Sequence, residues 1–257
     1  MTPFPRLVAF DLDDTLAPSK SPLDPRMARL LVRLLDVAEV CVISGGQIAQ
    51  FQVQLIDNLT DAAPESLMRL HLMPTCGTQY YRFLDGSWNQ VYAQNLSADE
   101  KKRALAAVEA SARELGFWES KTWGPILEDR GSQITFSALG QAAPVSVKTA
   151  WDPTGEKKNR LRVAVQEQLP DLEVRSGGST SVDITRRGID KAYGMTRLAE
   201  LTGYSLSEML FIGDRLDRDG NDYPVKALGV ECVAVEGWED TADHLEKLIP
   251  ELAAAIA

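Results

Sequence analysis

Two aspartates, Asp11 and Asp13, follow a short apolar run at residues 7–10 (LVAF). Because side chains alternate along an extended backbone, both carboxylates are expected to point the same way, while Leu12 packs elsewhere. Phosphoryl transfer needs an in-line nucleophile, a proton donor for the leaving oxygen, and positive charge to offset the anions. Asp11 can serve as nucleophile and metal ligand, and Asp13 as general acid and then base. The alternative interpretation is an acidic turn after a core strand.

A second candidate is the Ser-Gly-Gly sequence at residues 44–46, which follows an apolar run at residues 40–43. The Ser44 hydroxyl and the approachable backbone N–H groups around Gly45 could hold a phosphate oxygen. Ser-Gly-Gly is also common turn chemistry, so this segment alone is weak evidence. The same holds for Lys191 in the sequence Gly-Ile-Asp-Lys, since a lone lysine is usually a solvated charge.

A third acidic segment, GDRLDRDGND at residues 213–222, follows the apolar run MLFI. Carboxylates clustered after a buried strand suit a hard cation such as Mg²⁺, bound by one or two carboxylates with phosphate and water. A calcium-binding loop is the competing interpretation. Aligning Gly220 with the glycine of an EF-hand places Arg215 at the first ligand position and Lys226 at the position of the bidentate glutamate, so that interpretation fails at both ends.

The elements that must position these residues alternate along the chain. Helical periodicity at residues 24–36 and 191–202 separates the apolar runs, which predicts a doubly wound α/β fold with a parallel sheet. The expected strands are at residues 7–10, 40–43, 209–212 and 230–235. Ligands of such sheets bind beyond the carboxyl ends of the strands, where Asp11, Ser44 and Asp214 are expected to lie.

The middle of the chain has no unit in which a strand is followed by acidic residues, which predicts that residues 82–184 form an inserted domain. Residues 1–81 and 185–257 would then make the core. Ser97 and Glu100 form a capping box for a helix that runs to about residue 115. The other expected elements are a helix starting at Asp152 and Pro153 and strands at residues 132–139, 172–175 and 180–185.

Composition excludes several classes of function. The formal net charge of −10 over 257 residues argues against nucleic acid, which is bound by stripes of Lys and Arg. The apolar runs are strand-sized, far shorter than the roughly 20 residues of a membrane span, so no membrane partner is expected. Three scattered cysteines suggest neither disulfides nor a zinc site and fit a reducing cytoplasm. There is no P-loop, GxGxxG or GxSxG motif.

These signals, in this order, resemble the haloacid dehalogenase (HAD) superfamily. DLDDT matches motif one, ISGG with Ser44 motif two, Lys191 motif three, and GDRLDRDGND motif four. The position of the insertion resembles the group with a C2b cap (subfamily IIB), which contains sugar-phosphate phosphatases and eukaryotic-type phosphomannomutases. FDLDDTLAP and SGGSTSVDITRRGIDK are especially similar to the phosphomannomutases. The resemblance implies a HAD Rossmann-like core and an α+β cap that recognises the substrate.

The resemblance also implies roles for individual residues. Asp11 would be the nucleophile, Asp13 the acid/base, and Ser44 and Lys191 the phosphate ligands. Asp214 would bind Mg²⁺ beside Asp11, with the Asp13 main-chain carbonyl completing the protein ligands. Further residues are implied at the edge of the site: Asp222 at the metal or its waters, and Arg130, Ser181 and Asp183 of the cap at the sugar phosphate.

Three functions remain open at this point. The first is hydrolysis of a phosphorylated small molecule, expected to be a sugar phosphate, through an aspartyl-phosphate intermediate. The second is a hexose phosphomutase, which needs strong anion recognition in the cap. Phosphomannomutases have arginines at three cap positions, whereas this chain has Arg130, Trp123 and Gln141, so hydrolysis is favoured. The third is a non-catalytic sensor of phosphorylated metabolites, which the intact aspartate pair argues against.

Overall fold

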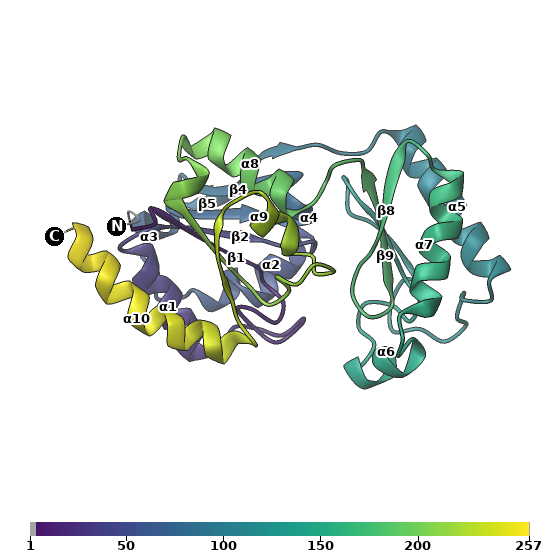
Figure 1. Cartoon of the computed structure of the whole chain (residues 1–257), viewed down its shortest axis with the longest axis horizontal. Helices are drawn as coiled ribbons and strands as arrows, with labels where there is room; N and C mark the ends of the chain where they lie inside the picture. Colours follow the sequence, from purple (N-terminus) through teal and green to yellow (C-terminus); the bar gives the residue numbers. More distant parts are fainter. Residues whose placement is uncertain (1–3, 257) are drawn as a thin grey trace. The chain divides into compact units, whose positions relative to one another are not determined.

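The computed structural model describes residues 4–256, which form two compact units. The first unit runs from the N-terminal side to Tyr92 and resumes at Asp190, and the second is Ala93–Ile189 (Figure 1). Within the described residues, each helix is too short or too polar to cross a membrane. The chain therefore leaves the first unit once and returns to it once.

The first unit is built on a seven-stranded sheet with the order β11-β10-β1-β2-β3-β4-β5. β1 is central and pairs in parallel with β2 and β10, so that Phe10 lies opposite both Val42 and Ile212. The residues that follow these strands therefore emerge at one edge of the sheet, as the predicted α/β fold requires. The strands are β1 (Leu7–Phe10), β2 (Glu39–Ile43), β3 (Leu70–Met73), β4 (Gln79–Leu84), β5 (Ser87–Ala93), β10 (Met209–Gly213) and β11 (Glu231–Ala234).

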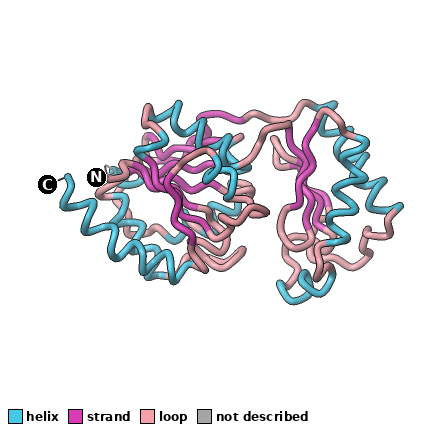
Figure 2. Tube along the Cα trace, in the orientation of Figure 1, coloured by secondary structure: helices cyan, strands magenta, loops and turns pink. Residues whose placement is uncertain are grey.

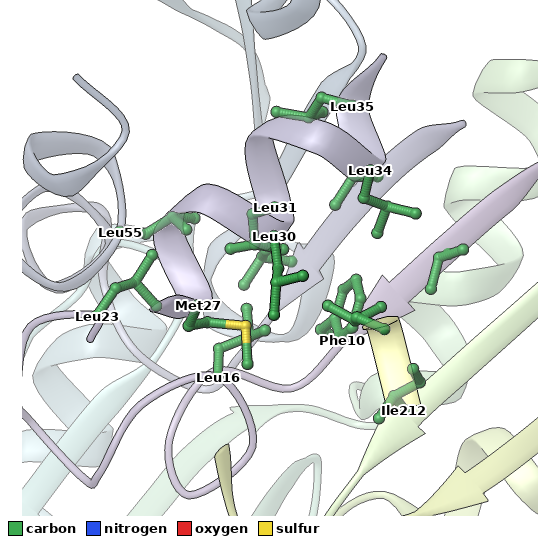
Figure 3. Close-up of a cluster of buried hydrophobic side chains, with 14 of the residues drawn as sticks. Phe10, Leu16, Leu23, Met27, Leu30, Leu31, Leu34, Leu35, Leu55 and Ile212 are labelled. Carbon is green, nitrogen blue, oxygen red and sulfur yellow. The ribbon is translucent and has the colours of Figure 1, made fainter. Parts of the chain in front are cut away.

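Helices cover both faces of this sheet, because successive residues of the buried strands point to opposite sides. Val8 and Phe10 pack in one apolar cluster with α1 and α10, and Leu7 and Ala9 in another with α8 and α9. Figure 3 shows Phe10 and Ile212 of the sheet with the leucines of α1. The helices of this unit are α1 (Pro25–Leu35), α2 (Ile48–Gln54), α3 (Pro64–Leu67), α4 (Pro74–Gly77), α8 (Lys191–Thr202), α9 (Tyr223–Ala227) and α10 (Trp238–Ile256), with 3-10 turns at Ile56–Asn58 and Leu206–Glu208.

The second unit has an antiparallel sheet with the order β6-β7-β9-β8 and helices on one side of it (Figure 2). Val182 and Ile184 of β9 pack toward α5 and α7 in an apolar cluster. Their neighbours Ser181 and Asp183 therefore lie on the opposite, polar face. The elements are β6 (Leu127–Asp129), β7 (Ile134–Ser137), β8 (Leu172–Ser176), β9 (Ser181–Arg186), α5 (Ala98–Glu114), α6 (Val145–Trp151) and α7 (Glu156–Gln168).

The division of the chain differs from the expected boundaries at 82 and 185. Residues 82–92 belong to the first unit, because β4 and β5 continue the core sheet beyond β3 through a hairpin whose turn residues Asp85 and Gly86 both have positive φ. Residues 185–189 belong to the second unit, because β9 extends to Arg186 and pairs with β8.

Two predicted helix starts in the second unit have different outcomes. The capping box of α5 is confirmed, since Ser97 Oγ accepts the Glu100 N–H at 3.2 Å and Glu100 Oε2 accepts the Ser97 N–H at 2.6 Å. The expected helix start at Asp152 is wrong, because α7 begins at Glu156. The Asp152 carboxylate instead reaches over an intervening turn to accept the Lys157 and Lys158 N–H groups.

Replacing Leu31 with alanine should destabilise the first unit by about 2–5 kcal/mol, because Leu31 is 2% exposed in the cluster between α1 and the sheet. Chemical denaturation monitored by circular dichroism measures this loss. Arg29→Ala, on the exposed side of the same helix, is the matched control and should change stability by less than about 0.5 kcal/mol. Equal effects of the two substitutions would contradict the packing described for α1.

Candidate active site

Asp11 is the first residue beyond β1, and its side chain is buried at the carboxyl edge of the sheet. Its N–H donates to the Ile212 carbonyl at 3.1 Å, so the ladder to β10 extends as far as this residue. The Leu12 N–H donates to Asp11 Oδ1 at 2.7 Å. The first bond fixes the main chain of Asp11, and the second fixes its carboxylate.

Lys191 is also buried, with 1% of its surface exposed, so it is not a solvated charge. Its Nζ lies 2.7 Å from Asp11 Oδ1 and 2.5 Å from Asp222 Oδ1. Asp190 places it at the first position of α8 by accepting the Tyr193 N–H at 3.0 Å as the N-cap. The lysine therefore joins the segments after β1 and β10.

The α8 helix can approach this edge because residue 194 is glycine. A Cβ at Gly194 would lie 2.2 Å from Ile43 Cδ1 and 2.9 Å from the Cys76 carbonyl oxygen. Real Cβ atoms do not make such contacts, so a larger residue would push α8 away from the sheet. The position of Lys191 thus depends on a glycine one turn further along its helix.

Asp214 and Asp222 complete an acidic cluster with Asp11. One carboxylate oxygen of each lies within 4.8 Å of those of the other two. Thr15 Oγ1 accepts the Asp214 N–H at 3.1 Å and lies 3.2 Å from Asp214 Oδ1. Asp222 Oδ2 accepts the Arg215 N–H at 3.1 Å. Three oxygen donors at this spacing fit Mg²⁺, which prefers carboxylates together with phosphate and water.

The charges of this cluster do not balance. Burial, opposed by Lys191 and reinforced by Asp222, raises the pKa of Asp11 to about 7. Burial and the charge of Asp222 also raise the pKa of Asp214. For Lys191, burial favours the neutral form, but Asp11 and Asp222 outweigh it and raise its pKa, so the ammonium persists. A single ammonium faces three carboxylates, and the excess negative charge favours a divalent cation.

Asp13 has different partners, so its carboxylate is not part of the acidic cluster. Its Oδ1 accepts the Lys20 N–H at 2.9 Å and Gln54 Nε2 at 3.2 Å, and its Oδ2 accepts Gln50 Nε2 at 2.9 Å. Lys20 Nζ lies 3.2 Å from Oδ2. Burial acts to raise the pKa of Asp13, but these contacts lower it overall. Metal binding by Asp13 is thus left to its main-chain carbonyl, as the resemblance implied, and that contact stays a prediction.

Ser44 lies at the same edge as Asp11. Phe10 lies opposite Val42, so Asp11 is level with Ile43, the last residue of β2, and Ser44 is the next residue along the chain. Its Oγ accepts the Gly46 N–H at 3.1 Å, which leaves the hydroxyl proton to donate to an anion. A Cβ at Gly45 would meet nothing within 4 Å, so its backbone is approachable. The phosphate-binding roles of Ser44 and Gly45 stay predictions.

The remaining predicted site residues belong to the second unit. Arg130 forms an ion pair with Glu128 at 2.7 Å. Ser181 Oγ lies 3.1 Å from Ser137 Oγ. Asp183 Oδ1 accepts bonds from Gln133 and Thr135 at 2.8 and 2.7 Å. Ser181 and Asp183 share the polar face of the sheet, as their spacing of two residues on a strand requires.

Several residues that shape the site were not predicted from the sequence. Thr15 follows the aspartate pair within motif one, and its position beside Asp214 could have been inferred from the shared edge of β1 and β10. Lys20, Gln50 and Gln54 contact Asp13 from a loop and from α2, and the sequence carries no local signal for them.

Comparison with known proteins places the chain among phosphoryl-transfer enzymes. A family model described as haloacid dehalogenase-like hydrolase matches residues 141–225. The chain is 25% identical over 256 residues to a probable phosphomannomutase of Caenorhabditis elegans, covering 96% of each. It is 24% identical over 225 residues to the phosphomannomutase of Saccharomyces cerevisiae, covering 85% of this chain and 84% of the relative.

Solved structures share the fold. The ATP-bound IMP-nucleotidase of Plasmodium falciparum matches 96% of this chain and 60% of its own length, with a TM-score of 0.75 and 15% identity. A haloacid dehalogenase-like hydrolase of Bacteroides thetaiotaomicron matches 95% of this chain and 99% of its own length, with a TM-score of 0.63 and 17% identity. At these identities the likeness supports the α/β core.

Mg²⁺ should raise the thermal unfolding midpoint, and more strongly at pH 8 than at pH 5. The raised pKa of Asp11 means that the native state binds more protons than the unfolded state between about pH 4 and 7. Stability without metal therefore falls as pH rises through that window, and a cation replaces the lost protons. At an Mg²⁺ concentration about 100 times its Kd, the free energy of unfolding should rise by about 2.7 kcal/mol.

Calorimetry with and without Mg²⁺ checks this expectation. Asp214→Asn should reduce the shift caused by Mg²⁺, whereas Asp219→Asn, exposed in the same loop, should retain it. A midpoint that Mg²⁺ does not change at pH 8 would exclude the acidic cluster as a magnesium site.

Proposed function

We propose that this chain, which belongs to the haloacid dehalogenase superfamily, is a magnesium-dependent phosphohydrolase that acts on a phosphorylated small molecule, namely a sugar phosphate. The observation that carries the proposal is the buried ammonium of Lys191, bound to both Asp11 and Asp222 beside Asp214. A nucleophile, a fixed cation and a set of metal ligands are the parts that phosphoryl transfer requires.

The contacts of Asp11 indicate which oxygen reacts. Leu12 N–H and Lys191 Nζ both contact Oδ1, so attack on phosphorus falls to Oδ2. As the Asp11–phosphorus bond forms, the bond to the leaving oxygen breaks, and that oxygen takes a proton from Asp13. Asp13 then removes a proton from the water that attacks the aspartyl phosphate, releasing inorganic phosphate and restoring Asp11.

The other residues bind and neutralise the phosphate. Lys191 and Ser44 would bind its oxygens, with the Gly45 backbone close to them. Asp11, Asp214 and the Asp13 main-chain carbonyl would hold Mg²⁺, with Asp222 at the metal or its waters. When bound, the ion supplies positive charge that offsets the negative phosphate and carboxylate oxygens.

The second unit would serve as the cap that recognises the substrate, through Arg130, Ser181 and Asp183. Its charges favour hydrolysis over a mutase reaction, in which the cap must hold a second phosphate while the intermediate turns around. The guanidinium of Arg130 is largely buried and already neutralised by Glu128. At the other two positions where phosphomannomutases have arginines, this chain has Trp123 and Gln141.

A hexose phosphomutase is the second candidate, because the curated relatives described above are phosphomannomutases that align over 85–96% of this chain. A sensor without catalysis would not need the Lys191 and aspartate arrangement, so we do not favour it. The net charge of −10 supports a small-molecule partner rather than nucleic acid. The free cysteines Cys41, Cys76 and Cys232 support a reducing, cytoplasmic location.

Asp11→Asn should reduce phosphate release by more than about 10³-fold, because the amide is nearly isosteric but is a poor nucleophile. A phosphate-release screen over sugar phosphates, with Mg²⁺ and with EDTA, measures the loss. Asp14→Asn is the matched control, since Asp14 is exposed and its carboxylate accepts the Ser19 N–H, a bond that an amide oxygen can also accept. Normal turnover by the Asp11 variant would refute covalent catalysis at this residue.

A hexose 1-phosphate supplied with a trace of the 1,6-bisphosphate should yield inorganic phosphate and little hexose 6-phosphate. The physical reason is the cap, where two charge-assisted contacts, each worth about 1.5–3 kcal/mol, are missing relative to a mutase. A coupled assay for the 6-phosphate, run beside phosphate release, separates the two reactions. Accumulation of the 6-phosphate without matching phosphate release would make the chain a mutase.

A further inference from the structure

The carboxylate of Asp13 is bound by four donors. Oδ1 accepts the Lys20 N–H and Gln54 Nε2, and Oδ2 accepts Gln50 Nε2 and lies 3.2 Å from Lys20 Nζ. Lys20 Nζ also donates to Gln50 Oε1, which closes a ring of contacts among Lys20, Gln50 and Asp13. Four donors fix both the position and the plane of a carboxylate.

Two of these donors come from one face of α2. Gln50 and Gln54 are four residues apart, so their side chains lie on the same side of the helix. Gln54 is 2% exposed and also donates to the Ser21 carbonyl at 2.9 Å, which ties α2 to the loop after motif one. Gln52 lies between them and bonds Asp57 instead. The α2 helix therefore presents two amide groups to Asp13 and directs a third away from it.

Gly46 provides the space in which Gln50 reaches Asp13. A Cβ at Gly46 would lie 2.3 Å from Gln50 Oε1 and 2.7 Å from Gln50 Cδ. A Cβ at Gly45 would meet nothing within 4 Å. The second glycine of the Ser-Gly-Gly sequence thus has a role other than exposing backbone to phosphate, because it leaves room for the side chain that binds Asp13.

We infer that Gln50 and Gln54 are positioning residues that fix the Asp13 carboxylate for proton transfer, and that Gly46 makes the Gln50 contact possible. The inference rests on the proposed function, in which Asp13 protonates the leaving oxygen. Acid and base groups act efficiently when hydrogen bonds from their neighbours hold them in one orientation. Loss of these donors should impair proton transfer and leave substrate binding and nucleophilic attack by Asp11 intact.

The test compares two substrates with Gln50→Met and Gln54→Met, which keep side-chain length and remove the amide donors. With a sugar phosphate, whose leaving oxygen needs a proton, kcat/KM, which reports the steps up to departure of the leaving group, should fall about 10–100-fold, part of the 10²–10⁴ that acid/base catalysis contributes. With p-nitrophenyl phosphate, whose leaving group needs none, kcat/KM should fall by less than about threefold, whereas kcat reports hydrolysis of the aspartyl phosphate as well and does not separate the two substrates. The inhibition constant of inorganic phosphate, which reports binding alone, should change by less than about twofold.

Three comparisons distinguish positioning from a general structural effect. Gln52→Met, on the same helix, should behave as the wild type. Gly46→Ala should reproduce the Gln50→Met pattern, because its Cβ displaces Gln50. In an Asp13→Asn background, Gln50→Met should cause no further loss on the sugar phosphate.

Equal losses of kcat/KM on both substrates, an additive loss in the Asp13→Asn background, or an increase in kcat/KM would overturn the inference. A wild-type protein that releases no phosphate would instead refute the proposed function. The Gln54–Asp13 contact can then still be measured by the coupling of Gln54→Met with Asp13→Ala in thermal unfolding, because alanine removes the oxygen that accepts Gln54 Nε2. If the contact is formed, their combined midpoint shift should differ from the sum of the two shifts by about 2–4 °C. Additive midpoint shifts would show that the contact is not formed.

Discussion

The rest of the structure depends on the buried ion pairs of Lys191. Transfer of an ammonium from water to a protein interior costs several kcal/mol, which only close carboxylates can offset. Asp11 and Asp222 do so from two different segments, at 2.7 and 2.5 Å. Removal of one partner from such a buried pair typically costs about 3–5 kcal/mol. The ends of β1 and β10 and the start of α8 must therefore lie close enough together to keep both contacts.

The sheet meets this requirement because its three central strands are covered on both faces. β1 lies between β2 and β10, and alternate residues of each strand fill two separate apolar clusters. If one strand slipped by one residue against its neighbour, the residues of the two apolar clusters would exchange faces of the sheet, so the register is strongly specified. The same register brings Ser44 and Asp214 to the edge where Asp11 emerges. The alternation of side chains along these strands thus sets both the packing of the core and the geometry of the site.

The strand-then-aspartate pattern was sufficient to predict the α/β core and the common edge of Asp11 and Asp214, because both follow from local periodicity and from the shared edge of parallel strands. Asp222 was implied by the family resemblance, and Asp13, also expected at the metal, has its carboxylate outside the acidic cluster. Two other features depend on tertiary packing. Alternation at residues 82–92 indicates a hairpin but does not specify the sheet that it extends. The glutamines of α2 have ordinary helical spacing, and their contact with Asp13 depends on how that helix packs against the loop after motif one.

The two crossings between the units are not equivalent. The outgoing chain leaves from an edge strand, β5, and enters α5 through a short connection, far along the sheet from β1. The returning chain ends on Asp190, the N-cap of α8, and the next residue is the buried lysine. A change of length at the first junction would therefore act on an edge strand and not on the strands that carry the site. Any change of length at the second junction would act directly on Lys191, so we expect the two junctions to differ in their tolerance of insertions.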